Sequence, residues 1–431
     1  MISFEKNTIR EKIFSLFLIL SIVFIALDRK FAVVLSIFLV LISIAVIIKR
    51  KVKVDKRCRF FILLFVIAMS LMPASVFWSI HNLHLFSWRE LDNYSRFLVF
   101  IPVGLALCFS NVKDHHILMA FSSAAVILAL RAIVDFDVVG QHRVLLDFRN
   151  PIPFGNVAMS ISVVSLISAI IYSTNLKYRA IFFVAGIVGL YGAFLSGNKG
   201  GIISLIILGA ISIYSYKAKI NIKILLITML VLSVWVINHF SSNFLSNQYS
   251  ILVTNAQCFL EDPYSRCALG PVGARVWMII AGVYIFINNI NYGVSSSELK
   301  NNIQSLIESG RLPKDMPIYD HLHNEIINQL ATYGLLGFMG YSVLVLGLIL
   351  LAYSLRGNLQ CVKYSFWKTQ LLVQVVLFVE FGFSQSLLSH SSTATYFSFI
   401  FSVFSGLLLM SYRQAIEKNT SDRSNKRTKS C

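Results

Sequence analysis

A dozen apolar runs constrain this chain more than any other feature. Each is long enough, or nearly so, to cross the hydrocarbon core of a bilayer, which takes roughly 20 residues of helix. The 97–110 and 201–216 runs are short, which leaves eleven or thirteen crossings open. The predicted spans cover residues 13–27, 31–48, 60–79, 97–110, 117–134, 155–173, 180–196, 201–216, 222–240, 333–354, 369–388 and 393–412.

Composition agrees with this interpretation. Hydrophobic residues fill 56% of the 431 positions and charged residues only 13%, whereas about a quarter of a soluble domain is charged. The mean hydropathy is +0.72. None of the runs alternates with period two, as the strands of a lipid-facing barrel would. We therefore predict an all-α integral membrane protein with about twelve transmembrane helices.

The positive charges predict the orientation of these helices. Placing the N-terminus in the cytoplasm puts most of the 38 Lys and Arg residues on that side, as the positive-inside rule requires. Both termini are then cytoplasmic. The net charge of +18 reflects this topology and attraction to anionic lipids. Because the basic residues form short clusters beside the membrane, we expect no nucleic-acid partner.

The runs divide the chain into four parts. Residues 1–240 contain the first nine predicted helices, 241–332 form a long extracytoplasmic loop, 333–412 contain the last three helices, and 413–431 form a disordered basic tail. The first run has no small-residue cleavage site, so we interpret it as a spanning helix and not as a signal peptide. Inside the loop, the apolar residues 276–287 are too few to span and are expected at the membrane interface.

Two cysteines share the long loop. Cys258 and Cys267 are nine residues apart, with a proline between them, and an oxidising compartment would favour a disulfide there. Two unpaired thiols are the alternative. The remaining cysteines lie in a span or on the cytoplasmic side and should be reduced: Cys58, Cys108, Cys361 and Cys431.

The segment that ends the long loop carries the chemistry. We expect a helix that starts near Asp320 and places His323, Leu330, Gly334 and Gly337 on one face, at about 100° per residue. The glycines would allow close contact with a neighbouring helix. The imidazole would then lie at the top of that face, where the membrane meets the aqueous phase.

At the start of this helix His323 would face the positive end of the dipole, which disfavours imidazolium. A neutral imidazole near pH 7 accepts a proton from a hydroxyl. His321, two residues earlier, would point about 200° away. An interfacial histidine that only hydrogen-bonds to its neighbours is the alternative interpretation.

The pattern His323-Asn324, then Gly334 and Gly337, resembles the signature of the O-antigen ligase family of bacterial lipopolysaccharide assembly. Its place at the end of a loop between the ninth and tenth spans is similar, as is the segment 273–275 ahead of a short apolar helix. The resemblance implies a GT-C-like fold in the inner membrane, with the active site facing the periplasm. It also implies transfer of a polysaccharide from undecaprenyl diphosphate to a sugar hydroxyl of lipid A–core.

The resemblance assigns further residues to the substrates. Arg275 would bind the carrier diphosphate, since guanidinium binds phosphate oxygens bidentately; a snorkelling interfacial arginine is the alternative. Asn324 would assist in substrate binding. Where the family has an arginine, this chain has Lys199, which keeps the positive charge but cannot make the two-pronged contact of a guanidinium. Arg143 and Arg149 are candidates to supply that bidentate contact.

The resemblance implies an inverting reaction without metal or cofactor. His323 would accept the proton of the attacking hydroxyl, while Arg275 and Lys199 stabilise the departing diphosphate. A metal site is the competing interpretation, because Asp135 and Asp137, or His321 and His323, are each two residues apart.

Other functions remain open on the sequence. An O-antigen polymerase would use the same carrier with a carrier-linked acceptor, and a protein-glycosylating ligase would use a protein acceptor. A glycolipid flippase or transporter would also have about a dozen helices, but the long loop and the scarcity of acidic residues in the spans, apart from Glu380, argue against it.

Overall fold

The computed structural model describes residues 9–25, 29–49, 56–83, 88–135, 151–172, 175–196, 244–354 and 362–428. Within these ranges the chain is helical and contains no β-strand. The elements are α1 (Ile9–Phe24), α2 (Arg29–Lys49), α3 (Lys56–Asn82), α4 (Trp88–Phe109), α5 (Asp114–Ile133), α6 (Pro151–Ile167), η2 (Ser168–Tyr172), α7 (Leu176–Leu195), α10 (Phe244–Glu261), α11 (Gly273–Asn288), α12 (Leu299–Glu308), α13 (Glu325–Ser354), α14 (Val362–Ser384), η3 (Leu387–Ser389) and α15 (Ser391–Thr428).

Nine helical segments in these ranges are long and apolar enough to cross a membrane. They overlap nine of the predicted spans. Helix α4 is longer than predicted because it begins at Trp88, and α14 ends at Ser384, four residues before the predicted end of its span at 388. The predicted first span corresponds to α1, whose 16 residues fall short of the roughly 20 needed to cross. The predicted spans 201–216 and 222–240 lie outside the described residues.

Apolar side chains also cover much of the outer surface of these helices. On α2, Ile37, Phe38 and Leu41 are each at least half exposed. Such continuous apolar surface is costly in water and favourable against lipid. The described helices are therefore those of a multi-pass membrane protein.

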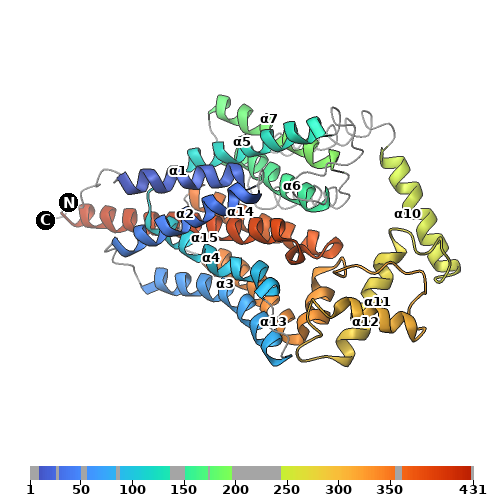
Figure 1. The fold of residues 1–431 in the computed structure, drawn as a ribbon. Coiled ribbons are helices and arrows are strands. Elements are labelled where there is room, and N and C mark those ends of the chain that lie inside the picture. The colour runs from blue at the N-terminus through green and yellow to red at the C-terminus, as the bar shows by residue number, and fades with distance from the viewer. Residues whose placement is uncertain are drawn as a thin grey trace.

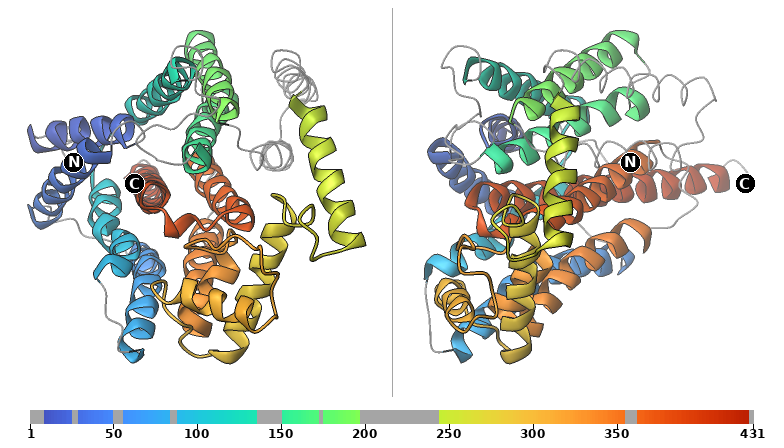
Figure 2. Two further views of the ribbon diagram at one scale, coloured as in Figure 1. Left: turned by 45° about the vertical axis from the view of Figure 1, so that its right-hand side comes forward. Right: turned by 90° about the vertical axis from the view of Figure 1, so that its right-hand side faces the viewer.

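The bundle is built around α15. Figure 2 shows this helix nearly end-on in its left panel, with the other helices around it, and its side chains from Ala394 to Met410 are mostly buried. It contacts α4 so closely that a Cβ at Gly406 would lie 2.5 Å from the carbonyl oxygen of Gly104. Only glycine allows that approach.

The long insertion, α10 to α12, lies at one end of the bundle, and α15 projects from the opposite end (Figure 1). The insertion has its own small core, in which Trp277, Met278, Leu299 and Leu322 are buried. The predicted disulfide between Cys258 and Cys267 is formed, with 5.7 Å between the Cα atoms. It joins the end of α10 to the turn before α11.

Helix α13 is broken at Gly334, which departs from the expectation of one regular helix. Gly334 has φ +65° and ψ −158°, a conformation that side chains other than glycine rarely adopt. A Cβ there would also lie 2.5 Å from the carbonyl of Asn291. The nearest atoms to a Cβ at Gly337 belong to its own helix, whereas Gly340 and Gly347 face α3. The predicted helix-contact role therefore falls on Gly340 and Gly347.

The break frees backbone groups that the insertion then satisfies. Three backbone hydrogen bonds of 2.7 to 3.0 Å join residues 331–335 to residues 290–295. Ser79 of α3 donates a further bond to the Tyr333 carbonyl at 2.8 Å. Irregular backbone inside a membrane bundle is tolerated only where protein pairs it. The break therefore attaches the insertion to the bundle.

Helix α4 holds the same segment from the other side. One oxygen of Glu90 accepts hydrogen bonds from the Ser295 hydroxyl at 2.9 Å and the Ser297 amide at 3.1 Å. The second oxygen accepts from the Ser296 amide at 3.3 Å. With the backbone bonds at the α13 break, this carboxylate sets the position of the insertion over the end of the bundle.

Candidate functional site

The two histidines lie before α13 and not on it. Helix α13 begins at Glu325, five residues later than predicted, because Asn324 is its N-cap: the Asn324 side-chain oxygen accepts from the Ile327 amide at 3.0 Å. Its side-chain nitrogen donates to the Phe383 carbonyl at 3.3 Å. Both ends of the Asn324 side chain are thus engaged in the fold, which favours a structural role over the predicted substrate contact.

His323 adopts a left-handed backbone conformation, with φ +49°. This conformation costs a residue other than glycine on the order of 1 kcal/mol and persists where its surroundings impose it, often at functional sites. It turns the imidazole toward His321, whose ring centroid lies 4.4 Å away, and Tyr319 packs edge-on at 5.1 Å. The expected 200° separation of the two histidines was wrong because the helix starts after both of them.

A third histidine and a glutamine complete the cluster, and sequence reasoning missed both. The Gln385 oxygen lies 2.8 Å from His323 Nδ1. The Gln385 nitrogen bonds to His390 Nε2 and lies 3.4 Å from His321 Nε2. The available signal was a glutamine and a histidine on either side of a short turn between two apolar runs.

The turn that carries Gln385 and His390 is held from two helices. Glu325, which is fully buried, accepts the Leu388 amide on one carboxylate oxygen at 3.0 Å and the Gln329 side chain on the other at 2.7 Å. From α4, Asn93 donates to the Leu388 carbonyl at 2.9 Å. The histidine cluster therefore rests on a rigid support at the end of the membrane bundle.

Arg275 approaches this cluster from the insertion, at the start of α11. Its cation is near enough to lower the pKa of His323, and burial lowers the pKa of Arg275 itself, an effect that Tyr319 opposes. In the described part of the chain no salt bridge is formed by Arg275. A half-buried cation without an ion pair is suited to an anionic ligand.

The three imidazoles are neutral at pH 7. Burial is the main cause in each case. It lowers the pKa of His321 to about 3 and of His390 to about 4, with further lowering from the neighbouring histidines. For His323, burial lowers the pKa, the hydrogen bond to the Gln385 oxygen opposes this lowering, and the charge of Arg275 lowers the pKa further. The predicted neutral imidazole is thus obtained through burial and not through the helix dipole.

The competing interpretation, a metal site at the Asp135–Asp137 or the His321–His323 pair, can be compared with the described residues. Among the described residues, no group of three or more His, Cys, Asp and Glu side chains is placed to hold a metal ion. Asp135 instead pairs with Arg131 at 3.2 Å. Asp137 lies outside the described residues, as do Lys199, Arg143 and Arg149.

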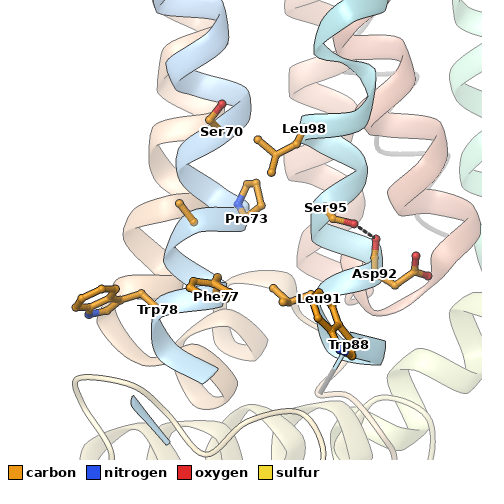
Figure 3. A pocket seen from close by; sticks show the side chains of 10 residues that line it. Ser70, Pro73, Phe77, Trp78, Trp88, Leu91, Asp92, Ser95 and Leu98 are labelled. Atoms are coloured by element: carbon orange, nitrogen blue, oxygen red, sulfur yellow. Dashed lines mark hydrogen bonds between the residues drawn. The ribbon is translucent and has the colours of Figure 1, made fainter. Parts of the chain in front are cut away.

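An apolar groove opens between α3 and α4, beside the same end of the bundle (Figure 3). It encloses about 720 Å³ and its walls include Phe77, Trp78 and Trp88. Asp92, on the α4 wall, pairs with Arg96 at 2.5 Å, and Arg96 in turn bonds to the Ser391 carbonyl. The groove wall is therefore connected to the turn that carries His390.

Comparisons with other proteins leave the family open. No protein-family model matches the chain. The chain is similar to an uncharacterized protein of Haemophilus influenzae strain Rd, with 25% identity over 316 residues, which cover 70% of this chain and 76% of that protein.

Proposed function

We propose that this protein is an O-antigen ligase, a glycosyltransferase of the bacterial inner membrane whose active site faces the periplasm. It transfers a polysaccharide from undecaprenyl diphosphate to a sugar hydroxyl of lipid A–core. The hydroxyl oxygen forms a bond to the anomeric carbon as the bond from that carbon to the diphosphate oxygen breaks, with inversion. The hydroxyl proton passes to His323, and undecaprenyl diphosphate leaves.

The observation that carries the proposal is the approach of the Arg275 cation to His323 at the end of the bundle, near enough for its charge to lower the pKa of His323. A neutral imidazole is a proton acceptor, and a half-buried guanidinium without an ion pair stabilises negative charge on a leaving phosphate. The two groups come from different segments, the loop just before α13 and the start of α11. Transfer from a diphosphate carrier needs both of these functions.

The membrane setting supports a lipid-linked donor. The groove between α3 and α4 offers an apolar, aromatic surface (Figure 3), and we assign it to the isoprenoid chain of the carrier. Lys199, Arg143 and Arg149 are proposed to add positive charge around the diphosphate and glycan. No metal or cofactor is assigned a role, because the diphosphate already activates the sugar.

The test is deletion of the gene followed by electrophoresis of lipopolysaccharide. Loss of a ligase leaves lipid A–core bare while carrier-linked polymer accumulates. Loss of a polymerase leaves the core capped with a single repeat, and unchanged lipopolysaccharide would contradict both functions. Complementation with the wild-type chain should restore the polymer on lipid A–core, and complementation with His323→Ala should not.

A further inference from the structure

The amide of Gln385 contacts all three histidines of the site, and its two ends are chemically different. The oxygen only accepts hydrogen bonds, and the nitrogen only donates them. The oxygen faces His323 Nδ1 at 2.8 Å, while the nitrogen faces the Nε2 atoms of His321 and His390. The direction of the amide therefore decides where each imidazole carries its proton.

We propose that Gln385 is a positioning residue that holds His323 as the tautomer with its proton on Nδ1 and its lone pair on Nε2. The inference rests on the proposed transfer reaction, in which that lone pair takes the hydroxyl proton. In the same arrangement the lone pairs of His321 and His390 on Nε2 accept the two amide hydrogens. Among the residues that the structure describes, nothing bonds to Nε2 of His323, so of the three rings that of His323 keeps a basic nitrogen for a ligand.

Hydrogen-bond satisfaction supports this direction of the amide over the reverse. Gln385 is fully buried, so an unpaired N–H there is costly. As described, both amide hydrogens have an acceptor and the oxygen has a donor. In the reverse direction both hydrogens would face the single His323 Nδ1 atom, and one would remain unpaired. His323 would then carry its proton on Nε2 and could not act as a base.

The surroundings keep the acceptors of the amide available. His321 and His390 accept from Gln385 only while they are neutral, and their low pKa values keep them neutral across the physiological range. Among the described residues, the charged groups that act on the cluster are Arg275, which lowers the pKa of His323, and Asp320, which raises the pKa of His321 and of His390. The Glu325 contact to the Leu388 amide keeps the turn after Gln385 in place.

The experiment combines ¹⁵N NMR of histidine-labelled protein in lipid nanodiscs with glycan transfer by the same preparation. The His323 signals are assigned by their loss in His323→Asn. We expect wild-type His323 to show a protonated Nδ1 and an unprotonated Nε2. A protonated Nε2 on His323 would overturn the inference.

Two substitutions of Gln385 distinguish a role in positioning His323 from a role in stability alone. Gln385→Leu removes the amide, so it should give a mixture of the two tautomers of His323. We expect kcat to fall by on the order of 10–100-fold with little change in KM. This loss is part of the 10²–10⁴-fold rate effect that a general base contributes. Gln385→Glu keeps an acceptor for the Nδ1 proton, so it should retain that tautomer. Its negative charge should raise the pKa of His323 and move the acidic limb of the kcat profile to higher pH.

Gln374→Leu is the matched control. Gln374 lies on α14, is fully buried, and donates to the Ser160 carbonyl at 3.3 Å, away from the histidines. Its loss should lower stability but leave the His323 tautomer and the kcat of folded enzyme unchanged. Wild-type tautomer and kcat in Gln385→Leu would overturn the inference. A wild-type protein that shows the expected tautomer but transfers no glycan would overturn the proposed function alone.

Discussion

Helix α14 has a buried polar cluster at each end, and the two clusters differ in how their charges are balanced. At its start, Lys363 Nζ lies 2.9 Å from Asp114 Oδ2, and the Tyr172 hydroxyl donates to the same oxygen at 3.5 Å. Just beyond its end, Gln385 meets three neutral histidine rings, and the Arg275 cation approaches without an ion pair among the described residues.

The difference separates a structural site from one able to act on a ligand. In the Lys363–Asp114 pair each charge is neutralised by the other within the fold, so the pair has nothing to offer a substrate. In the Gln385 cluster, a ring nitrogen of His323 and the positive charge of Arg275 have no hydrogen-bond or ion-pair partner in the part of the chain that the structure describes. A buried polar group that the fold does not use is costly, and a ligand that pairs with it recovers that cost.

The largest expected effect is that of His323→Ala on glycan transfer. Removal of a general base costs about 10²–10⁴-fold in rate, and the variant should still insert, fold and bind the carrier-linked glycan. The measurement uses purified enzyme with chelator present. His321→Ala is the comparison: it removes only one acceptor of the Gln385 amide and should lose less activity. The metal interpretation would be favoured if both variants lost activity equally, and if zinc added after chelation restored the activity of the wild-type enzyme.

Lys363→Met should act on stability and not on transfer. Removing one partner of a buried pair leaves the other charge uncompensated, which typically costs about 3–5 kcal/mol. The lower end is expected, because the Lys363 side chain is 27% exposed. Unfolding in detergent measures the loss, and kcat per folded molecule should be unchanged.

Adding Asp114→Asn to Lys363→Met removes both charges and should recover most of the lost stability. If Lys363→Met abolished transfer by folded enzyme, the distinction between the two ends of α14 would be lost.

Arg275→Lys should lower kcat/KM for the carrier-linked donor by about 10–100-fold. Lysine keeps the charge but loses one arm of the bidentate phosphate contact, and a hydrogen bond to a charged group contributes about 1.5–3 kcal/mol. Arg311→Lys is the control, because Arg311 belongs to the same insertion but stacks over Tyr284 at 5.9 Å. Equal effects of the two substitutions would remove Arg275 from the anion site.

The last expected effect is the dependence of stability on mild acid. His321 and His390 have folded pKa values of about 3 and about 4, below the unfolded value of about 6.5. The unfolded chain therefore binds more protons, so the stabilisation is complete above about pH 6.5 and is lost as pH falls toward these folded values.

The expected slope is up to about 1.4 kcal/mol per pH unit for each of these histidines. Chemical unfolding at pH 7, 6 and 5 measures it. His390→Gln should reduce the slope by about half, and an unchanged slope would show that His390 is not buried as a neutral ring.

The fold was predictable to the extent that it depends on local pattern. Apolar runs predicted the positions of the described spanning helices, because a helix in lipid must satisfy its backbone within its own segment. The pairing of Cys258 with Cys267 was equally local. The start of α13 was missed, because the Asn324 cap and the left-handed His323 fix it. The break at Gly334 was missed because it depends on residues 290–295.

The candidate site, like the fold, was predictable only where it depends on local sequence. His323 and Arg275 were predicted from short segments, and the sequence by itself determined that an imidazole and a guanidinium lie in the long loop beside apolar runs. Only the tertiary structure decided that His321, His323 and His390 converge on Gln385, which is 62 residues from His323 in the chain. It also decided that the imidazoles are neutral through burial. Hydrogen bonds between distant segments form only when the helices pack, so no local pattern encodes them.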